Sequence, residues 1–130
     1  MKYLLDTNVV SHAIRGQGRV AENLLAHAPS EFGVSSITIA ELAFGVEKRE
    51  APRLAREVRE FLRPIEILPF DEDVAWRYGI LGAHLQRTGE TIGVLDTMIA
   101  AHAMVRDLIL VTSNSKHFDR IAGLRWEDWY

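Results

Sequence analysis

Residues 108–111 read Leu-Ile-Leu-Val, a continuous apolar run that predicts a strand buried on both of its faces. Strands of this kind are typical of parallel sheets that helices cover on both sides. Working outward, we expect three more short strands, at residues 3–5, 32–35 and 65–68. Apolar residues at helical spacing predict helices at residues 9–14, 20–28, 52–63, 71–88 and 94–103. Strands that alternate with helices predict an α/β fold with a central, largely parallel sheet.

Length and composition suit one globular domain spanning residues 1–130, and we find neither a repeat nor a linker. Hydrophobic residues make up 48% of the chain, which is enough for a core. The absence of cysteine excludes disulfides and thiolate metal sites. The first apolar run is too short for a signal peptide, and no later run approaches a membrane span. We therefore expect a cytoplasmic protein without membrane contact.

The formal charge of −3 argues against a simple nucleic-acid binder, which is usually basic. The basic residues are unevenly placed, however. From Lys48 to Arg63 there are six basic residues against three acidic ones, a local charge of +3. Four arginines fall roughly on one face of the predicted helix: Arg53, Arg56, Arg59 and Arg63. They form either a solvated face paired with nearby glutamates or a contact for the RNA backbone, and both interpretations stay open.

Asp6 ends a strand that is predicted to be buried, which is an unusual place for an acid. In open α/β sheets, ligands bind beyond the carboxyl ends of the strands. Asn114 and Asp119 follow another such end, after residues 108–111. The alternative for Asp6 is that it only caps the helix that follows.

Glu41 and Asp96 are further acids in apolar surroundings. Thr38 to Glu41 has the spacing of a helix capping box, and Asp96 lies in the first turn of a predicted helix, where its charge suits the helix dipole. If these acids converge with Asp6, their charges raise one another's pKa unless a cation joins them. Oxygen ligands without cysteine or paired histidine suit Mg²⁺ or Mn²⁺ better than Zn²⁺.

Four segments then follow one another along the chain. They are Leu-Asp-Thr-Asn at 5–8, Ser-Ile-Thr-Ile-Ala-Glu-Leu at 36–42, Ile-Gly at 92–93 with Asp96 and Ala-His-Ala at 101–103, and Leu-Val-Thr-Ser-Asn at 110–114 with Phe-Asp at 118–119. In this order and spacing they resemble the PIN-domain ribonucleases, and more narrowly the VapC toxins of bacterial VapBC toxin–antitoxin pairs. The resemblance spans nearly the whole chain, including Gly-Leu-Arg at 123–125 and Glu-Asp-Trp at 127–129.

The resemblance implies a PIN-like doubly wound domain with a central parallel sheet flanked by helices. It implies that Asp6, Glu41 and Asp96 bind Mg²⁺, or Mn²⁺, and are catalytic. A fourth catalytic position falls on Asp119 or on Asn114, and we place Asp119 first. Supporting roles, orienting carboxylates or water, are open to Thr7, Asn8, Thr112 and Asn114, although we favour a purely structural role for each. Leu95 departs from the family, in which this residue is often polar.

The implied activity is that of a Mg²⁺-dependent endoribonuclease, the toxin of a type II toxin–antitoxin system. Relatives with this pattern cut structured RNAs, including initiator tRNA in its anticodon loop. The implied partners are RNA, a small VapB-like antitoxin and a second copy of the chain in a homodimer, which would assemble with the antitoxin into a larger complex.

Other functions remain open at this point. The chain could be a catalytically weak binding module that acts as a corepressor with a DNA-binding antitoxin, although the intact acids argue against it. A DNA nuclease is disfavoured by the small size and the toxin-like tail. A phosphoacceptor signalling domain would need Lys116 beside Asp6.

Histidines and C-terminal aromatic residues suggest no separate chemistry. The five histidines show no paired metal spacing, and we expect His102 to pack rather than to react. Trp126, Trp129 and Tyr130 could stack on RNA bases, but we expect them to pack in the core or in a dimer.

Overall fold

The computed structural model describes all 130 residues and contains one five-stranded sheet in the order β3-β2-β1-β4-β5. Every pair of neighbouring strands is parallel. The strands are β1 (Tyr3–Leu5), β2 (Phe32–Ser35), β3 (Glu66–Leu68), β4 (Ile109–Val111) and β5 (Trp126–Glu127). The order runs outward in both directions from the central β1, which is the doubly wound arrangement expected from the sequence.

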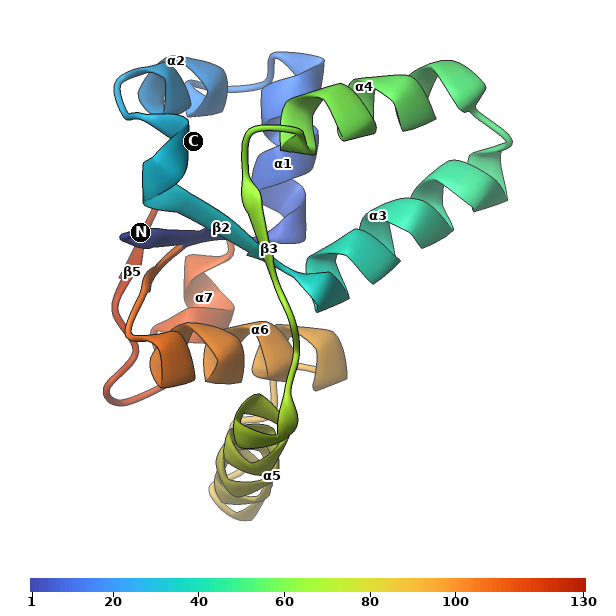
Figure 1. Ribbon diagram of the computed structural model, residues 1–130. Helices are drawn as coiled ribbons and strands as arrows, with labels where there is room; N and C mark the ends of the chain where they lie inside the picture. The colour runs from blue at the N-terminus through green and yellow to red at the C-terminus, as the bar shows by residue number, and fades with distance from the viewer.

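Helices cover both faces of this sheet, with α1 to α4 on one side and α5 to α7 on the other (Figure 1). The first group is α1 (Thr7–Arg15), α2 (Val20–Leu25), α3 (Ser36–Arg49) and α4 (Pro52–Leu62), with a short 3-10 turn η1 (Pro29–Glu31). The second group is α5 (Glu72–Arg87), α6 (Val94–Arg106) and α7 (Ser115–Phe118). No helix is long and apolar enough to cross a membrane.

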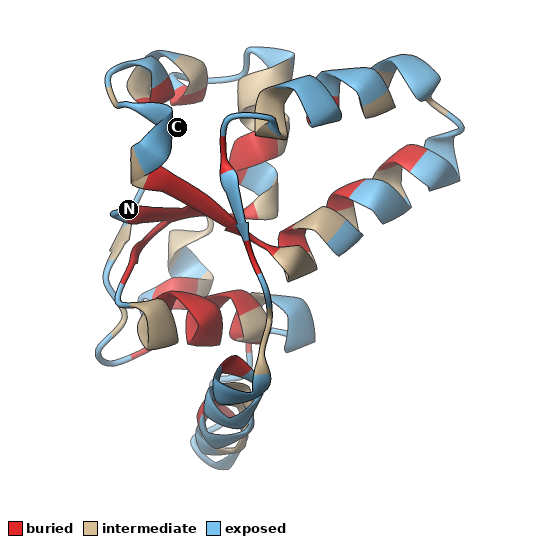
Figure 2. Cartoon of the chain, viewed as in Figure 1, coloured by how far each residue is buried: buried red, intermediate tan, exposed pale blue.

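The alternation of side chains along the central strands divides the core into two clusters. Tyr3 and Leu5 of β1 belong to the cluster beneath α1 to α4, whereas Leu4 belongs to the cluster beneath α5 to α7. Strand β4 repeats the pattern, with Leu110 facing opposite to its two neighbours. Buried positions therefore gather on the strands and on the helix faces turned toward them (Figure 2). Both faces of these strands are apolar because both are covered, as their uninterrupted hydrophobic runs predict.

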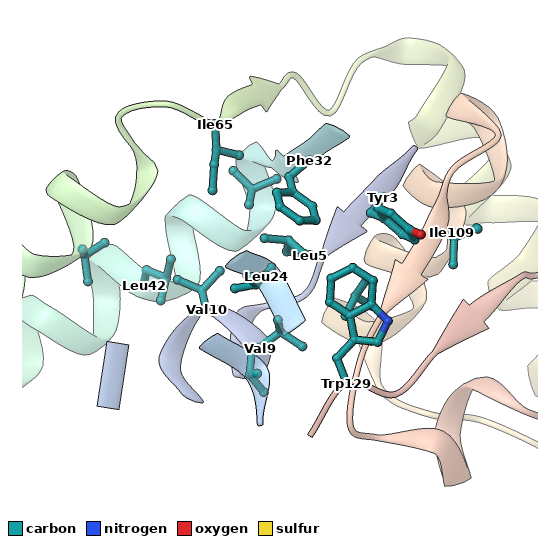
Figure 3. Close-up of a cluster of buried hydrophobic side chains, with 14 of the residues drawn as sticks. Tyr3, Leu5, Val9, Val10, Leu24, Phe32, Leu42, Ile65, Ile109 and Trp129 are labelled. Carbon is teal, nitrogen blue, oxygen red and sulfur yellow. The ribbon is translucent and has the colours of Figure 1, made fainter. Parts of the chain in front are cut away.

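The C-terminal tail closes the first cluster. Trp129 is 9% exposed and its ring meets Tyr3 edge-on, with the centroids 4.8 Å apart (Figure 3). The same indole stacks on His27 at 4.9 Å. Core packing of Trp129 is thereby confirmed, while Tyr130 remains 54% exposed.

Three local expectations from the sequence are wrong. The predicted helix at 20–28 ends at Leu25, because Ala28 precedes Pro29 and takes the extended conformation that proline imposes on the residue before it. Strand β5 was not predicted; it has two residues at the sheet edge, neither of them buried. The capping box from Thr38 to Glu41 does not form, since Ser35 is the N-cap of α3 and its hydroxyl accepts a hydrogen bond from the N–H of Ile37.

Candidate active site

Asp6 lies at the carboxyl end of the central strand, where the chain turns into α1. Its backbone N–H donates to the carbonyl of Val111 in β4, and its carboxylate Oδ1 accepts a hydrogen bond from the N–H of Val9 at 2.8 Å. Asp6 therefore caps α1, and the capping alternative is correct as far as it goes. The cap uses one oxygen of a side chain that is only 7% exposed.

The surroundings of Asp6 oppose its negative charge. Burial raises the pKa of Asp6 from 3.8 to about 6; the nearby Thr112 hydroxyl and the Val9 N–H pull it back, while the charges of Asp96 and Glu41 raise it further. Asp96 and Glu41 thus lie close enough to Asp6 to repel its charge. The three acids, 35 and 55 positions apart along the chain, share one electrostatic neighbourhood at the carboxyl edge of the sheet.

Glu41 lies in α3, directly after β2, and its carboxylate is held by α1. Thr7 donates its hydroxyl hydrogen to Glu41 Oε1 at 2.6 Å. This bond joins the residue after Asp6 to an acid 34 positions away, so the orientation of Glu41 depends on tertiary structure. Both side chains are partly buried.

Asp96 lies in the first turn of α6, and its carboxylate is held by the α7 turn that follows β4. Asp96 Oδ2 is 2.7 Å from His117 Nδ1 and 3.2 Å from Asn114 Nδ2. Asn114 is thereby placed beside an acid. His117 was missed in the sequence; the spacing Asn114-x-x-His117, which puts both residues on one face of a helical turn, was the available signal.

The remaining candidate residues are distributed as follows. Thr112 is fully buried, and its hydroxyl accepts a hydrogen bond from the N–H of Asn114, which shapes the turn after β4. Asn8 and Asp119 are exposed, and the side chain of Asp119 forms no hydrogen bond with the other acids. The choice between Asp119 and Asn114 as the fourth site residue stays a prediction.

The four arginines of α4 are exposed and do not form ion pairs with the acids of the site. Arg53 pairs with Glu57 at 3.4 Å and Arg63 with Glu60 at 2.6 Å, so part of this surface is the paired face that we considered. Arg56 and Arg59 have no ion-pair partner. Figure 1 draws α3 between α4 and α6, so the arginines line a neighbouring surface rather than the site itself.

The acids fit a divalent cation by their chemistry, although no three acidic or histidine side chains converge into a ready-made cage. The test is Asp6: a carboxylate that is buried, repelled by two others and not paired with any basic side chain gains from a nearby cation. Asp6, Asp96 and Glu41 offer only oxygen ligands, which suit Mg²⁺ or Mn²⁺. The residues present are thus compatible with the cation.

Two alternatives can now be judged. Lys116 is exposed and forms no ion pair with Asp6, which excludes the phosphoacceptor arrangement. His102 is fully buried, and its Nδ1 is 2.8 Å from the hydroxyl of Ser35, so the expectation that it packs is confirmed.

Comparison with known proteins agrees with this geometry. Residues 3–124 match the family model of the PIN domain. The chain is 37% identical to the tRNA(fMet)-specific endonuclease VapC of Shigella flexneri, over 99% of this chain and 98% of that protein. It is 38% identical to Ribonuclease VapC2 of Haemophilus influenzae with the same coverage. The crystal structure of VapBC2 from Rickettsia felis, bound to a DNA fragment from its promoter, has a TM-score of 0.92 at 35% identity, covering 100% of both chains.

The chain therefore belongs to the PIN-domain family, whose fold and acidic sheet edge it shares. Within that family it groups with the VapC toxins of VapBC pairs, and the resemblance inferred from the sequence is confirmed.

Proposed function

We propose that this chain is a metal-dependent endoribonuclease, the toxin of a toxin–antitoxin pair, which hydrolyses RNA phosphodiester bonds. The observation that carries the proposal is the buried carboxylate of Asp6, held at the end of the central strand with Asp96 and Glu41 beside it. Such a cluster destabilises the fold unless it serves a purpose, and cation binding is the purpose that its chemistry supports. The names of the relatives as ribonucleases support the same activity.

Each residue has a part in this proposal. Asp6 and Asp96 would be the main ligands of Mg²⁺ or Mn²⁺, and Glu41 and Asp119 would complete the site directly or through water. The bound cation would supply an activated water and positive charge for the phosphorane-like transition state. Thr7 keeps Glu41 Oε1 turned toward the N-terminus of α1 by its hydrogen bond, and thereby orients that carboxylate.

Purified, antitoxin-free protein incubated with total bacterial RNA tests the activity. We expect discrete cuts with Mg²⁺ or Mn²⁺ and none with EDTA. A folded protein that leaves RNA intact with either metal would contradict the nuclease, and would favour the corepressor alternative.

The RNA substrate is proposed from the relatives. One of them is named a tRNA(fMet)-specific endonuclease, and 37% identity over nearly the whole chain supports a related RNA, with the initiator tRNA anticodon loop as the first choice. Loops are accessible because their bases are unpaired. Mapping of the cut ends in the same digest would identify the RNA, and cuts spread evenly over unrelated RNAs would contradict a specific substrate.

The unpaired arginines of α4 lead to a separate prediction. We expect the double variant Arg56→Ala/Arg59→Ala to bind RNA more weakly and to reduce the slope of log affinity against log salt by about one, because released counterions scale with phosphate contacts. Binding is measured in EDTA so that the RNA stays intact. Arg53→Ala/Arg63→Ala is the matched control, since those side chains are paired with glutamates. An unchanged slope in the first variant would remove the RNA contact.

The partners are proposed on similar grounds. The Rickettsia felis structure is a VapBC complex on DNA, which supports a VapB-like antitoxin for this chain. For the homodimer, four apolar side chains are exposed on α5 and at the start of α6: Trp76, Ile80, Val94 and Leu95. Exposed apolar groups gathered on adjacent helices are typical of an interface. Sedimentation of the antitoxin-free chain as a monomer at all concentrations would contradict the homodimer.

A further inference from the structure

Three side chains on the α6–α7 side of the site form a tight triangle: Asp96, Asn114 and His117. Asp96 Oδ2 is 2.7 Å from His117 Nδ1 and 3.2 Å from Asn114 Nδ2, and the two nitrogens are 2.8 Å apart. The side chains of Asp96 and His117 are 36% and 38% exposed, so the triangle lies at the rim rather than in the core. The nuclease chemistry described above assigns no part to His117.

The chemistry of the three groups determines where the hydrogens lie. An ionised carboxylate can only accept, so the short contact requires that His117 Nδ1 carry a proton and donate it to Asp96 Oδ2. A protonated Nδ1 cannot accept from the amide of Asn114, which therefore directs its N–H to the same Oδ2. Two donors thus converge on one oxygen. The other oxygen, Oδ1, has no hydrogen-bond partner in the protein and keeps its lone pairs for a ligand.

The turn that carries His117 is itself held in place. The N–H of His117 donates to the carbonyl of Asn114 at 3.1 Å, and the N–H of Asn114 donates to the hydroxyl of buried Thr112 at 3.0 Å. The next residue, Phe118, is 1% exposed and packs in the core beneath α5 and α6. Because the imidazole is anchored in this way, its Nδ1 can restrain the carboxylate rather than follow it.

We propose that His117 is a positioning residue that holds the Asp96 carboxylate, through Nδ1–H and Oδ2, in the orientation that binds the divalent cation. The inference rests on the proposed metal-dependent nuclease and adds to it the residue that orients one of its ligands. Loss of a hydrogen-bonding partner behind a metal ligand typically lowers metal affinity about 10–100-fold. Asn114, at the longer distance, has the weaker hold on the same oxygen.

The test is the affinity for Mn²⁺ alone, measured by calorimetry on the metal-stripped, antitoxin-free protein without RNA. We expect His117→Ala to weaken Mn²⁺ binding by about 10–100-fold. His117→Asn places an amide N–H where Nδ1–H lies and should keep most of the affinity, whereas His117→Gln places it where Nε2 lies and should not. His84→Ala, an exposed histidine of α5 remote in sequence, is the control for loss of an imidazole.

Asp96→Asn separates the two levels of the proposal. If Asp96→Asn loses Mn²⁺ but His117→Ala binds it like the wild type, the positioning role is overturned and the metal site stands. If His117→Gln retains the affinity and His117→Asn loses it, Nε2 rather than Nδ1 is the important atom, and the proposal is again overturned. If Mn²⁺ affinity is the same in Asp96→Asn and the wild type, the metal role proposed for Asp96 fails, and the inference fails with it.

Discussion

Asp6→Asn is expected to abolish RNA cleavage and, at the same time, to make the fold more stable at pH 7. The two side chains have nearly the same shape, and asparagine is as good an N-cap as aspartate, so the hydrogen bond from the Val9 N–H is kept. What disappears is a buried negative charge and a metal ligand. Loss of the ligand should remove several kcal/mol of transition-state stabilisation, which lowers the cleavage rate at least about 100-fold.

The gain in stability follows from the pKa of Asp6. Its value of about 6, raised by burial from 3.8, means that the folded state favours the protonated acid. The stabilisation from this preference is complete below pH 3.8 and is lost as the pH rises through 6, so ionised Asp6 destabilises the fold at neutral pH. A shift of this size corresponds to about 3 kcal/mol as an upper value. The advantage of Asp6→Asn in free energy of unfolding should therefore grow between pH 4 and 6 and stay constant above pH 6.

Denaturant unfolding at several pH values and a cleavage assay measure the two effects. Asp96→Asn is the matched control: it should also lose cleavage, but with a smaller gain in stability, since its carboxylate is more than a third exposed. Mn²⁺ should raise the melting temperature of the wild type more than that of Asp6→Asn, because binding to the folded state stabilises it. If Asp6→Asn were less stable than the wild type at pH 7, the electrostatic basis of the proposed site would be lost.

His102→Asn is expected to remove a second, opposite dependence of stability on pH. Burial lowers the pKa of His102 from 6.5 to about 4, with Arg106 lowering it further and Asp71 partly opposing. The imidazole is fully enclosed, with Nδ1 bonded to Ser35 and Nε2 without a partner. Stability from the neutral imidazole is complete above pH 6.5 and is lost as the pH falls through 4, by up to about 3 kcal/mol.

Asp6 and His102 therefore act in opposite directions over nearly the same pH range. In the wild type the two contributions largely cancel between pH 6.5 and 4. Acidification over this range should reveal the loss due to His102 in Asp6→Asn, and the gain due to Asp6 in His102→Asn. The slope of unfolding free energy against pH is the quantity to compare, because the smaller asparagine also costs packing at every pH. Equal slopes in His102→Asn and the wild type would contradict a neutral, buried His102.

Most of the fold could be predicted from the sequence because its signals are local. The four buried strands are uninterrupted apolar runs, and the capping role of Asp71 on α5 is visible three residues from its partner, Val74. Strand β5 could not be predicted, since two exposed-edge residues have no apolar run to mark them. The wrong capping box has a similar origin: Ser35, Ser36 and Thr38 are all capping residues, and only the end of β2 selects Ser35.

The site divides in the same way. The acids Asp6, Glu41 and Asp96 could be chosen from the sequence, because each is an acid in an apolar segment at a strand end or near a helix start. Their partners could not be chosen. Thr7 reaches Glu41 across 34 positions, and His117 reaches Asp96 across 21.

The sequence by itself thus determined the α/β class, the parallel sheet and the acidic residues at its edge, since these depend on runs and spacings of neighbouring residues. Only the tertiary structure decided which oxygen of each carboxylate is bonded, and that Asp6 is buried beside two other acids. Hydrogen bonds and charge repulsion act through a few ångströms of space, and folding brings within that distance residues that are far apart along the chain.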